Sequence, residues 1–426
     1  MPFFALDRLI RARAPVATGG GRERGSGEPG RFLITADVVY EGLGTPRQGA
    51  ALAVFEESLG NLVVTAIGDG DELMAAHPRS MKIDAGLAVS PAPVNAHTHL
   101  DLSGMPFTPG TYEKFLDAVV AHARSGGRGL SAAKSGLAEV KKSGVSVIGD
   151  VVTDPAVMEM LLADEEISGV AYWEVISGRP EVADERFEQA VSAVNRFRAL
   201  ERPGGVRVGV SPHTPHTVSP ALMRRVTAWA RLEGLPVAIH VAESPAEREL
   251  HLSGTGSVAD ALRAFGMPFQ PTGVSPVRYL HDLGALAGGP TLVHMVAVDD
   301  EDVRLAQAAG CAVVHCPRSN EALGCGRFPW ELFARHGVDV ALGTDSRGSA
   351  PDLDVVAEAH AAIALHGARV SPRAVVRAGV KGGYRALGMR PKRLSGGAAA
   401  SEFGAWLLGD ASPASGAAGA TWGAEA

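Results

Sequence analysis

The sequence of 426 residues contains few cysteines, and none of them belongs to a C-x-x-C pair. Cys311, Cys316 and Cys325 form an odd and sparse set, which is typical of a chain in a reducing compartment without a disulfide framework. The absence of C-x-x-C also excludes the zinc sites whose signature ends in P-C-x-x-C. We therefore expect a cytoplasmic protein in which any metal site uses ligands other than cysteine.

The sequence also lacks a long apolar run and an excess of basic residues. No stretch of about 18 uninterrupted apolar residues exists, so no membrane-spanning helix is expected. The formal net charge of −7 argues against a nucleic-acid partner and favours a small-molecule ligand. A signal peptide has an apolar segment directly after its charged start, and residues 1–30 contain no such segment. We therefore expect a flexible tail there.

Apolar residues make up 46 % of the chain, which is enough for a large core. Residues 31–90 contain short apolar runs separated by glycine and charged residues, and this pattern predicts a small β subdomain. The apolar run FGAWLL predicts that residues 397–415 return to the same subdomain. The last residues of the chain are expected to be flexible.

Residues 91–396 alternate between short apolar runs and longer segments of helical periodicity. This alternation predicts an α/β fold, a (β/α)₈ TIM-like barrel flanked by the small β subdomain. A doubly wound sheet would also alternate, but it would not explain why polar side chains end so many of the runs. The eight apolar runs are 91–99, 145–152, 169–176, 207–213, 236–243, 291–298, 311–317 and 338–346.

Histidines and one aspartate lie near the ends of four predicted strands. His97 and His99 form an H-T-H on the first strand, where residues two apart face the same side. His240 lies on the fifth, His294 on the sixth and Asp345 ends the eighth. Barrels build their sites at the carboxyl ends of strands, so these groups are expected to meet. An H-T-H alone would more often be a hydrogen-bonded loop pair, but the full set suits a divalent ion such as Zn²⁺ or Fe²⁺.

The motifs VNAHTHLDLS, HVAES, LVHMV, CPRSNEALG and LGTDS together resemble the metal-dependent amidohydrolase superfamily. The resemblance is greatest to its branch of cytosine, guanine and adenosyl-homocysteine deaminases and chlorohydrolases, and it covers residues 31 to 400. It implies that His97, His99, His240 and Asp345 are the metal ligands. No lysine lies between residues 143 and 380, which excludes the carboxylated lysine that bridges two metals in some members. One ion, Zn²⁺ or alternatively Fe²⁺, is therefore expected, with Glu174 as an alternative bridging carboxylate.

Glu243 lies three residues after His240, at the start of a predicted helix, where a carboxylate can simply favour the helix dipole. The resemblance implies instead the H-x-x-E acid/base residue of the deaminase branch, which protonates a ring nitrogen. Asp345 would accept a proton from the metal-bound water, and His294 would orient it. These roles predict a hydrolase that deaminates an adenine-type nucleoside by attack of metal-bound hydroxide on the ring carbon.

Five further residues are candidates for contact with the substrate or its loops. His213 matches a substrate-contacting histidine of the branch, whereas His216 stands where tyrosine is common and could equally be an exposed loop residue. Arg318 is predicted either to pair with a substrate carboxylate or to be a surface arginine. Asn320 would face the substrate or hold its loop. Phe328 would cover an apolar part of the ligand or pack within a helix.

Within the branch, the whole chain is most similar to the bacterial aminodeoxyfutalosine deaminases of menaquinone biosynthesis, which act on an adenine nucleoside bearing a benzoate. Arg318 would then bind the benzoate. Another purine or pyrimidine deaminase, an adenosyl-homocysteine deaminase and a triazine chlorohydrolase are alternatives. A catalytically silent scaffold is disfavoured, because such relatives typically lose the histidines. A homo-oligomer is compatible with the sequence.

Overall fold

The computed structural model describes residues 3–13, 30–58, 61–267 and 269–407. These residues belong to two compact units of the chain. The smaller unit comprises Met1–Tyr40, Pro46–Val89 and Ser395–Ala426, and the larger one comprises Glu41–Thr45 and Ser90–Leu394.

The smaller unit is built from two sheets and two helices. One sheet has the order β6-β5-β2-β7, and its β5–β6 hairpin is antiparallel; the other has the order β1-β17-β8-β3-β4. Helix α2 begins after Asp69, whose carboxylate accepts the backbone N–H groups of Asp71 and Glu72 and so caps the helix. The bounds are β1 (Phe3–Ala5), α1 (Leu6–Arg13), β2 (Arg31–Thr35), β3 (Val38–Val39), β4 (Arg47–Gln48), β5 (Ala50–Ser58), β6 (Asn61–Asp69), α2 (Gly70–Ala76), β7 (Met81–Asp84), β8 (Ala88–Pro91) and β17 (Phe403–Trp406).

The start of the chain differs from the flexible tail that we expected over residues 1–30. Strand β1 pairs antiparallel with β17, and helix α1 buries Leu6, Leu9 and Ile10. Residues spaced by three and four lie on one face of a helix, so this short segment has an apolar stripe to bury. The rest of the expected tail, residues 14–29, and the end of the chain beyond residue 407 lie outside the described residues.

The larger unit contains two four-stranded parallel sheets, with the orders β9-β10-β11-β12 and β13-β14-β15-β16. Each of the eight predicted apolar runs overlaps one of these strands, and β11 and β12 begin one residue before their runs. Strand β10 is buried along its whole length, as expected for a parallel strand that is covered on both faces. The strands are β9 (Val94–Thr98), β10 (Val147–Val152), β11 (Ser168–Val175), β12 (Val206–Pro212), β13 (Ala238–Val241), β14 (Thr291–His294), β15 (Ala312–His315) and β16 (Val340–Leu342).

The outer edges of the two parallel sheets are linked to each other. An isolated bridge joins Val210 on β12 to Val237 just before β13, and a second joins Thr98 on β9 to Asp345 just after β16. The eight strands therefore follow one another in chain order, and the carboxyl ends of all of them lie on the same side of the sheets. The predicted α/β class with a parallel sheet is confirmed.

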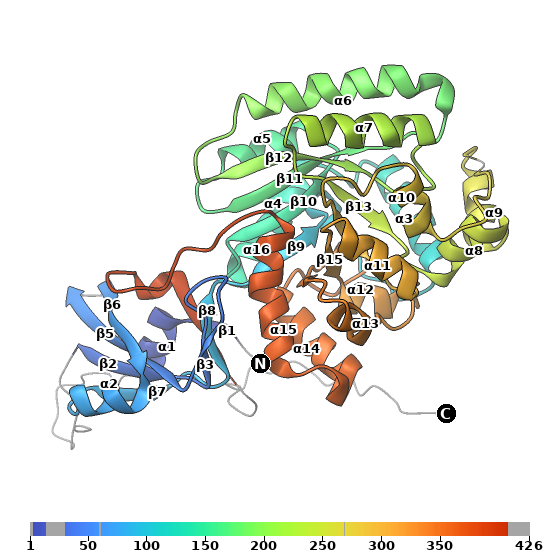
Figure 1. Cartoon of the computed structure of the whole chain (residues 1–426). Coiled ribbons are helices and arrows are strands. Elements are labelled where there is room, and N and C mark those ends of the chain that lie inside the picture. Colours follow the sequence, from blue (N-terminus) through green and yellow to red (C-terminus); the bar gives the residue numbers. More distant parts are fainter. Residues whose placement is uncertain (1–2, 14–29, 59–60, 268, 408–426) are drawn as a thin grey trace. The chain divides into compact units, whose positions relative to one another are not determined.

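Helices connect these strands and flank them (Figure 1). Five of them, α5, α7, α8, α10 and α15, begin with a serine or aspartate cap followed by proline, a sequence that satisfies free N–H groups and presets the first turn. No helix in the described part of the chain is long and apolar enough to cross a membrane. The helices are η1 (Leu100–Leu102), α3 (Tyr112–Arg124), α4 (Leu130–Lys142), α5 (Pro155–Ala163), η2 (Pro180–Val182), α6 (Ala183–Arg198), α7 (Pro220–Leu232), α8 (Pro245–Ser253), α9 (Ser257–Ala264), α10 (Pro276–Asp282), α11 (Asp300–Ala308), α12 (Pro317–Ala322), α13 (Trp330–Arg335), α14 (Val355–His366), η3 (Gly367–Arg369), α15 (Pro372–Arg377), η4 (Ala378–Gly382) and α16 (Gly383–Ala386).

Candidate metal centre and active site

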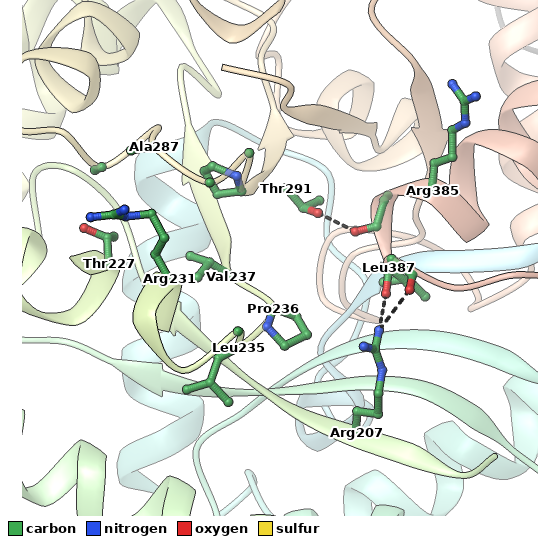
Figure 2. A pocket seen from close by; sticks show the side chains of 17 residues that line it. Arg207, Thr227, Arg231, Leu235, Pro236, Val237, Ala287, Thr291, Arg385 and Leu387 are labelled. Atoms are coloured by element: carbon green, nitrogen blue, oxygen red, sulfur yellow. Dashed lines mark hydrogen bonds between the residues drawn. The ribbon is translucent and has the colours of Figure 1, made fainter. Parts of the chain in front are cut away.

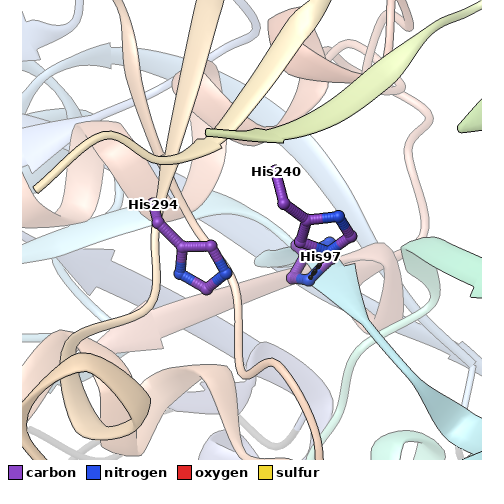
Figure 3. A group of neighbouring side chains, drawn as sticks. All are labelled: His97, His240 and His294. Atoms are coloured by element: carbon purple, nitrogen blue, oxygen red, sulfur yellow. Dashed lines mark hydrogen bonds between the residues drawn. The ribbon is translucent and has the colours of Figure 1, made fainter. Parts of the chain in front are cut away.

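The predicted metal ligands converge at the carboxyl ends of the parallel strands. His97 lies on β9 and His99 directly after it, and the Nε2 atoms of both rings are 3.6 Å from Oδ1 of Asp345. The Nε2 atom of His240, on β13, is 3.3 Å from Nε2 of His97 and also 3.3 Å from Nε2 of His99. Figure 3 shows His97, His240 and His294 pointing toward one another from three different strands. Side chains that are distant in the sequence thus meet at one point.

The donor atoms of this cluster suit a divalent cation. Desolvation by burial lowers the pKa values of His99 and His240 well below the ordinary value, so both rings are neutral. Nδ1 of His240 hydrogen-bonds to the carbonyl oxygen of His213 at 3.1 Å, which places the ring proton on Nδ1 and leaves the lone pair of Nε2 facing the cluster. Neutral imidazoles with free lone pairs around a carboxylate are the ligands that Zn²⁺ prefers.

Asp345 is held so that one oxygen faces the histidines. Its Oδ2 accepts hydrogen bonds from Ser319 at 2.7 Å and Ser349 at 2.9 Å, which leaves Oδ1 directed at the cluster. Burial acts to raise the pKa of Asp345, but the hydrogen bond from His97 and the charges of the neighbouring histidines outweigh it and hold that pKa well below its ordinary value. The side chain is therefore a carboxylate, as a metal ligand must be.

The backbone around the cluster is strained. In the described chain, the non-glycine residues with positive φ are Ala242, His294, Met295 and Asp345, all at strand ends that surround the site. Such conformations cost about 1–3 kcal/mol each and persist where the surrounding structure enforces them, often at functional sites. Gly343 belongs to the same region, because a Cβ atom there would come within 2.8 Å of Cβ of His97.

Glu243 lies beside the cluster, between the end of β13 and the start of α8. The side chain is buried, and Oε2 is 3.6 Å from Nε2 of His294. Desolvation, followed by the charges of Asp345 and Glu247, raises the pKa of Glu243 well above its ordinary value, which favours the protonated carboxyl group. The backbone N–H of Glu243 donates to Oε2 of Glu247 at 2.7 Å, which fixes the chain at this position.

Asn320 fixes the orientation of His294. Its Nδ2 atom lies 3.1 Å from Nδ1 of His294 and can only donate, so Nδ1 accepts and the ring proton lies on Nε2, toward Glu243. Burial lowers the pKa of His294 to about 4, which keeps the ring neutral. Asn320 is itself buried and is not among the described residues that line the cavity of the site. Asn320 therefore contacts His294 from outside the lining of the cavity.

A cavity of about 260 Å³ opens onto the cluster. His213 and His216 line it together with the metal-cluster side chains. Nδ1 of His213 hydrogen-bonds to Oγ1 of Thr217 at 2.8 Å, so its Nε2 is available to a ligand. His216 is buried, with Nδ1 3.7 Å from Oε1 of Glu247, and is not an exposed loop histidine.

The structure does not place Arg318 in the cavity, where the prediction that it binds a substrate carboxylate would require it. Its Nε donates to Oε1 of Glu358 at 2.7 Å, and one terminal amine lies 2.7 Å from Oδ1 of Asp352. The side chain points toward helix α14 and does not line the cavity. Both of its charge-assisted contacts are therefore made within the protein.

The structure does not place Phe328 in the cavity either, although the sequence predicted that it could cover a ligand. The ring is 1 % exposed and stacks on the rings of His315 and Phe333, with centroids 4.2 and 4.7 Å away. It packs in the core behind β15. Packing within the protein was the other possibility that the sequence left open.

Glu174 lines the cavity, where its Oε1 atom is 3.9 Å from Nε2 of His213. Among the described residues, the groups close enough to share an ion do not include Glu174. The structure therefore gives no support to a bridging role for this side chain. Desolvation raises its pKa to about 7.

Sequence reasoning missed several residues of the cavity, among them Tyr112 and Arg128. Tyr112 begins helix α3, and the neighbouring charge of Glu243 adds to burial in raising its pKa well above the ordinary value. Arg128 lies in the segment S-G-G-R-G between α3 and α4. The only signal for Arg128 in the sequence is that it is an isolated cation in a glycine-rich loop after the H-T-H strand. This signal is weak.

A larger cavity, of about 440 Å³, lies at the opposite ends of the strands and offers a less suitable site (Figure 2). The described residues that line it include no histidine or carboxylate. The guanidinium group of Arg207 donates to the carbonyl oxygen of Leu387 at 2.5 Å, and Arg231 and Arg385 point in different directions. These contacts stabilise the amino-terminal face of the strands, where barrels carry stability and not chemistry.

Comparison with known families agrees with this geometry. A model of the amidohydrolase family matches residues 88–400. Because the match covers well over half of the chain, the protein belongs to the amidohydrolase family, as the resemblance implied.

Individual relatives show which members of the family this chain resembles. The aminodeoxyfutalosine deaminase of Deinococcus radiodurans is 43 % identical over 385 residues, which are 88 % of this chain and 90 % of the relative. The solved structure of Helicobacter pylori aminofutalosine deaminase in complex with methylthio-coformycin has a TM-score of 0.68 at 19 % identity, covering 84 % of this chain and 88 % of that one. An adenosine deaminase of Xanthomonas campestris with bound zinc has a TM-score of 0.59 at 24 % identity, covering 85 % and 81 %.

Proposed function

We propose that the protein is a metal-dependent hydrolytic deaminase of adenine-type nucleosides, with 6-amino-6-deoxyfutalosine as its substrate. The observation that carries this proposal is the buried Glu243, with its raised pKa, beside the cluster of histidines and Asp345. A proton donor at this place is what deamination of an aromatic amidine requires. The similarity to the Deinococcus radiodurans enzyme supports the substrate.

His97, His99, His240 and Asp345 would hold one divalent cation, most simply zinc. When bound, such a cation activates water for attack at neutral pH. The neutral rings and the fixed carboxylate support this set of ligands. Closure of the eight linked strands into a (β/α)₈ barrel belongs to the same proposal, and the two isolated bridges support it.

The protein's own groups then move the protons. The carboxylate of Asp345 accepts a proton from the attacking water, and Nε2–H of His294 orients the oxygen. Glu243 donates its proton to the ring nitrogen next to the carbon that is attacked. Asp345 passes the proton that it took from water to the exocyclic amine, whose bond to that carbon breaks as the hydroxyl oxygen becomes a carbonyl. The hydroxyl proton returns to Glu243, and ammonia leaves.

A substrate panel tests this function. The metal-loaded protein is incubated with 6-amino-6-deoxyfutalosine, adenosine, S-adenosylhomocysteine, cytosine and a chlorotriazine, and ammonia and chloride are measured. We expect ammonia from the adenine nucleosides, fastest from the first, and no chloride from the triazine. Chloride release without ammonia would contradict the proposal and assign the site to a chlorohydrolase.

A further inference from the structure

One cation faces the cavity of the candidate active site. Arg128 is the only lysine or arginine among the described residues that line it. It comes from the loop between α3 and α4, and its side chain is 20 % exposed, so a solute in the cavity can reach it. The metal-binding and acid/base roles described above do not use this group.

Arg128 is held by one edge of its guanidinium group. Nε lies 2.6 Å from Oδ2 of Asp101, and the same oxygen accepts a hydrogen bond from Thr153 at 2.9 Å. Asp101 is buried, so the anchor is rigid. Within the described part of the chain, the two terminal amines of Arg128 make no hydrogen bond. These amines form the planar pair of donors that matches a carboxylate.

The charge of Arg128 is stable in this position. Burial disfavours the cation, but Asp101 and then Glu174 outweigh burial and raise the pKa of Arg128. Glu174 also lines the cavity, and desolvation raises its pKa to about 7. At neutral pH a large share of the molecules therefore carry a protonated Glu174, which does not compete with an incoming anion and can donate a hydrogen bond to it.

The cavity wall next to this cation is apolar. One face of α3 contributes side chains spaced by three and four residues, and α9, which contacts α3, contributes others (Figure 1). The chain leaves α3 directly into the loop that carries Arg128, so the apolar face and the cation belong to one segment. The lining side chains of the two helices include Phe115, Leu116, Val119, Val120 and Leu262.

Arg128 and the histidine cluster line the same cavity, and the charge of Arg128 acts on His99 and His213. The proposed reaction requires the neutral purine beside Glu243 and Asp345. A substrate with an acidic end would therefore bind in one orientation, with its acid at Arg128 and its purine at the cluster.

We propose that Arg128 forms the carboxylate subsite of this enzyme and selects adenine nucleosides whose 5′ substituent ends in an aromatic acid. This inference rests on the proposed function and extends it to substrate selection. It replaces Arg318, whose donors are taken by Glu358 and Asp352.

The test removes the charge of Arg128 from the protein and, independently, the carboxylate charge from the substrate. kcat/KM is measured for the wild-type enzyme, Arg128→Gln and Arg128→Lys on 6-amino-6-deoxyfutalosine, on its methyl ester and on adenosine. Loss of a charge-assisted pair should lower kcat/KM of Arg128→Gln for the acid by about 10- to 150-fold. The values for the ester and adenosine should change by less than about threefold. Arg128→Lys should recover part of the loss.

The matched control is Arg124→Gln, which removes the same charge from the exposed end of α3 outside the cavity. It should leave all three substrates unaffected. Equal losses on acid and ester in Arg128→Gln would overturn the proposal, because they would show that the pair with Asp101 only supports the loop. If Arg128→Gln fails to fold, a wild-type preference for the ester over the acid overturns it without any variant.

The failure of this inference is distinguishable from failure of the proposed function. Ammonia release from adenosine and the ester without preference for the acid rejects the carboxylate subsite but keeps the deaminase. No ammonia from any adenine nucleoside by the metal-loaded enzyme rejects both.

Discussion

Glu243 is the residue on which the chemistry depends most. Its carboxyl group is buried beside His294, and the charges of Asp345 and Glu247 add to burial in raising its pKa. A carboxyl group with a raised pKa retains its proton more readily than an exposed glutamate and is better suited to act as a general acid.

Glu243→Gln should therefore keep the fold and the metal but lower kcat by about 10²–10⁴-fold, because an amide has no acidic proton to deliver. The matched control is Glu249→Gln on α8, the helix that follows Glu243, where the side chain of Glu249 is exposed. Turnover of Glu243→Gln near that of the control would mean that Glu243 is only a helix-end carboxylate.

Asn320 acts through His294 and offers a second test at this scale. Asn320→Leu removes the donor at Nδ1 of His294, so the ring is free to place its proton on either nitrogen. We expect kcat to fall while KM for the nucleoside changes little, because the side chain does not line the cavity. Asn320→Gln should recover less than wild-type activity but more than leucine. A rise in KM with unchanged kcat would contradict this positioning role.

At the scale of helices and strands, the ion pair of Arg318 with Glu358 joins α12 to α14. Glu358 is fully buried, and removing its partner leaves an uncompensated buried group. Arg318→Ala should therefore lower the free energy of unfolding by about 3–5 kcal/mol, measured by urea denaturation. The control Arg327→Ala breaks an exposed pair with Glu331 and should cost less than about 1 kcal/mol.

The same variant separates structure from recognition. Arg318→Ala should reduce the activity on the acid nucleoside and on adenosine by the same factor, because the guanidinium group does not reach the cavity. A selective loss on the acid would restore Arg318 as the residue that reads the carboxylate.

Helix α1 gives a prediction for the smaller unit. Leu6 is fully buried there, so Leu6→Ala should lower the free energy of unfolding by about 2–5 kcal/mol. Arg8→Ala, on the exposed side of the same helix, should have almost no effect. Equal and small effects of both variants in denaturant titrations would mean that this segment does not contribute to the stability of the unit.

At the scale of the whole molecule, two features of the sequence predicted most of the fold and the site. They are the periodicity of the apolar residues and the polar side chains at the ends of the strands. The eight apolar runs each overlap a strand, because a strand covered on both faces must be apolar along its length. His97, His240 and Asp345 meet because the carboxyl ends of parallel strands lie on one side of the sheets. A side chain at the end of a strand therefore has a place that the sequence can predict.

The residues that the sequence did not place correctly are those in loops and first helical turns. Arg318 lies in the first turn of α12, and no pattern in the sequence says whether it turns toward the cavity or toward α14. Arg128 lies in a glycine-rich loop with no periodicity to fix its direction. Phe328 was ambiguous for the same reason, since an aromatic ring near a site is as often part of the core. Tertiary packing decides these cases.

The central claim is that one metal ion held by His97, His99, His240 and Asp345 makes this chain a nucleoside deaminase. The most direct measurement strips the protein with a chelator, adds zinc in fractions of an equivalent, and records ammonia release from 6-amino-6-deoxyfutalosine at each step. The account predicts activity that is absent without metal and rises linearly to a plateau at one zinc per chain. A plateau at two equivalents, or deamination that is independent of added metal, would contradict it.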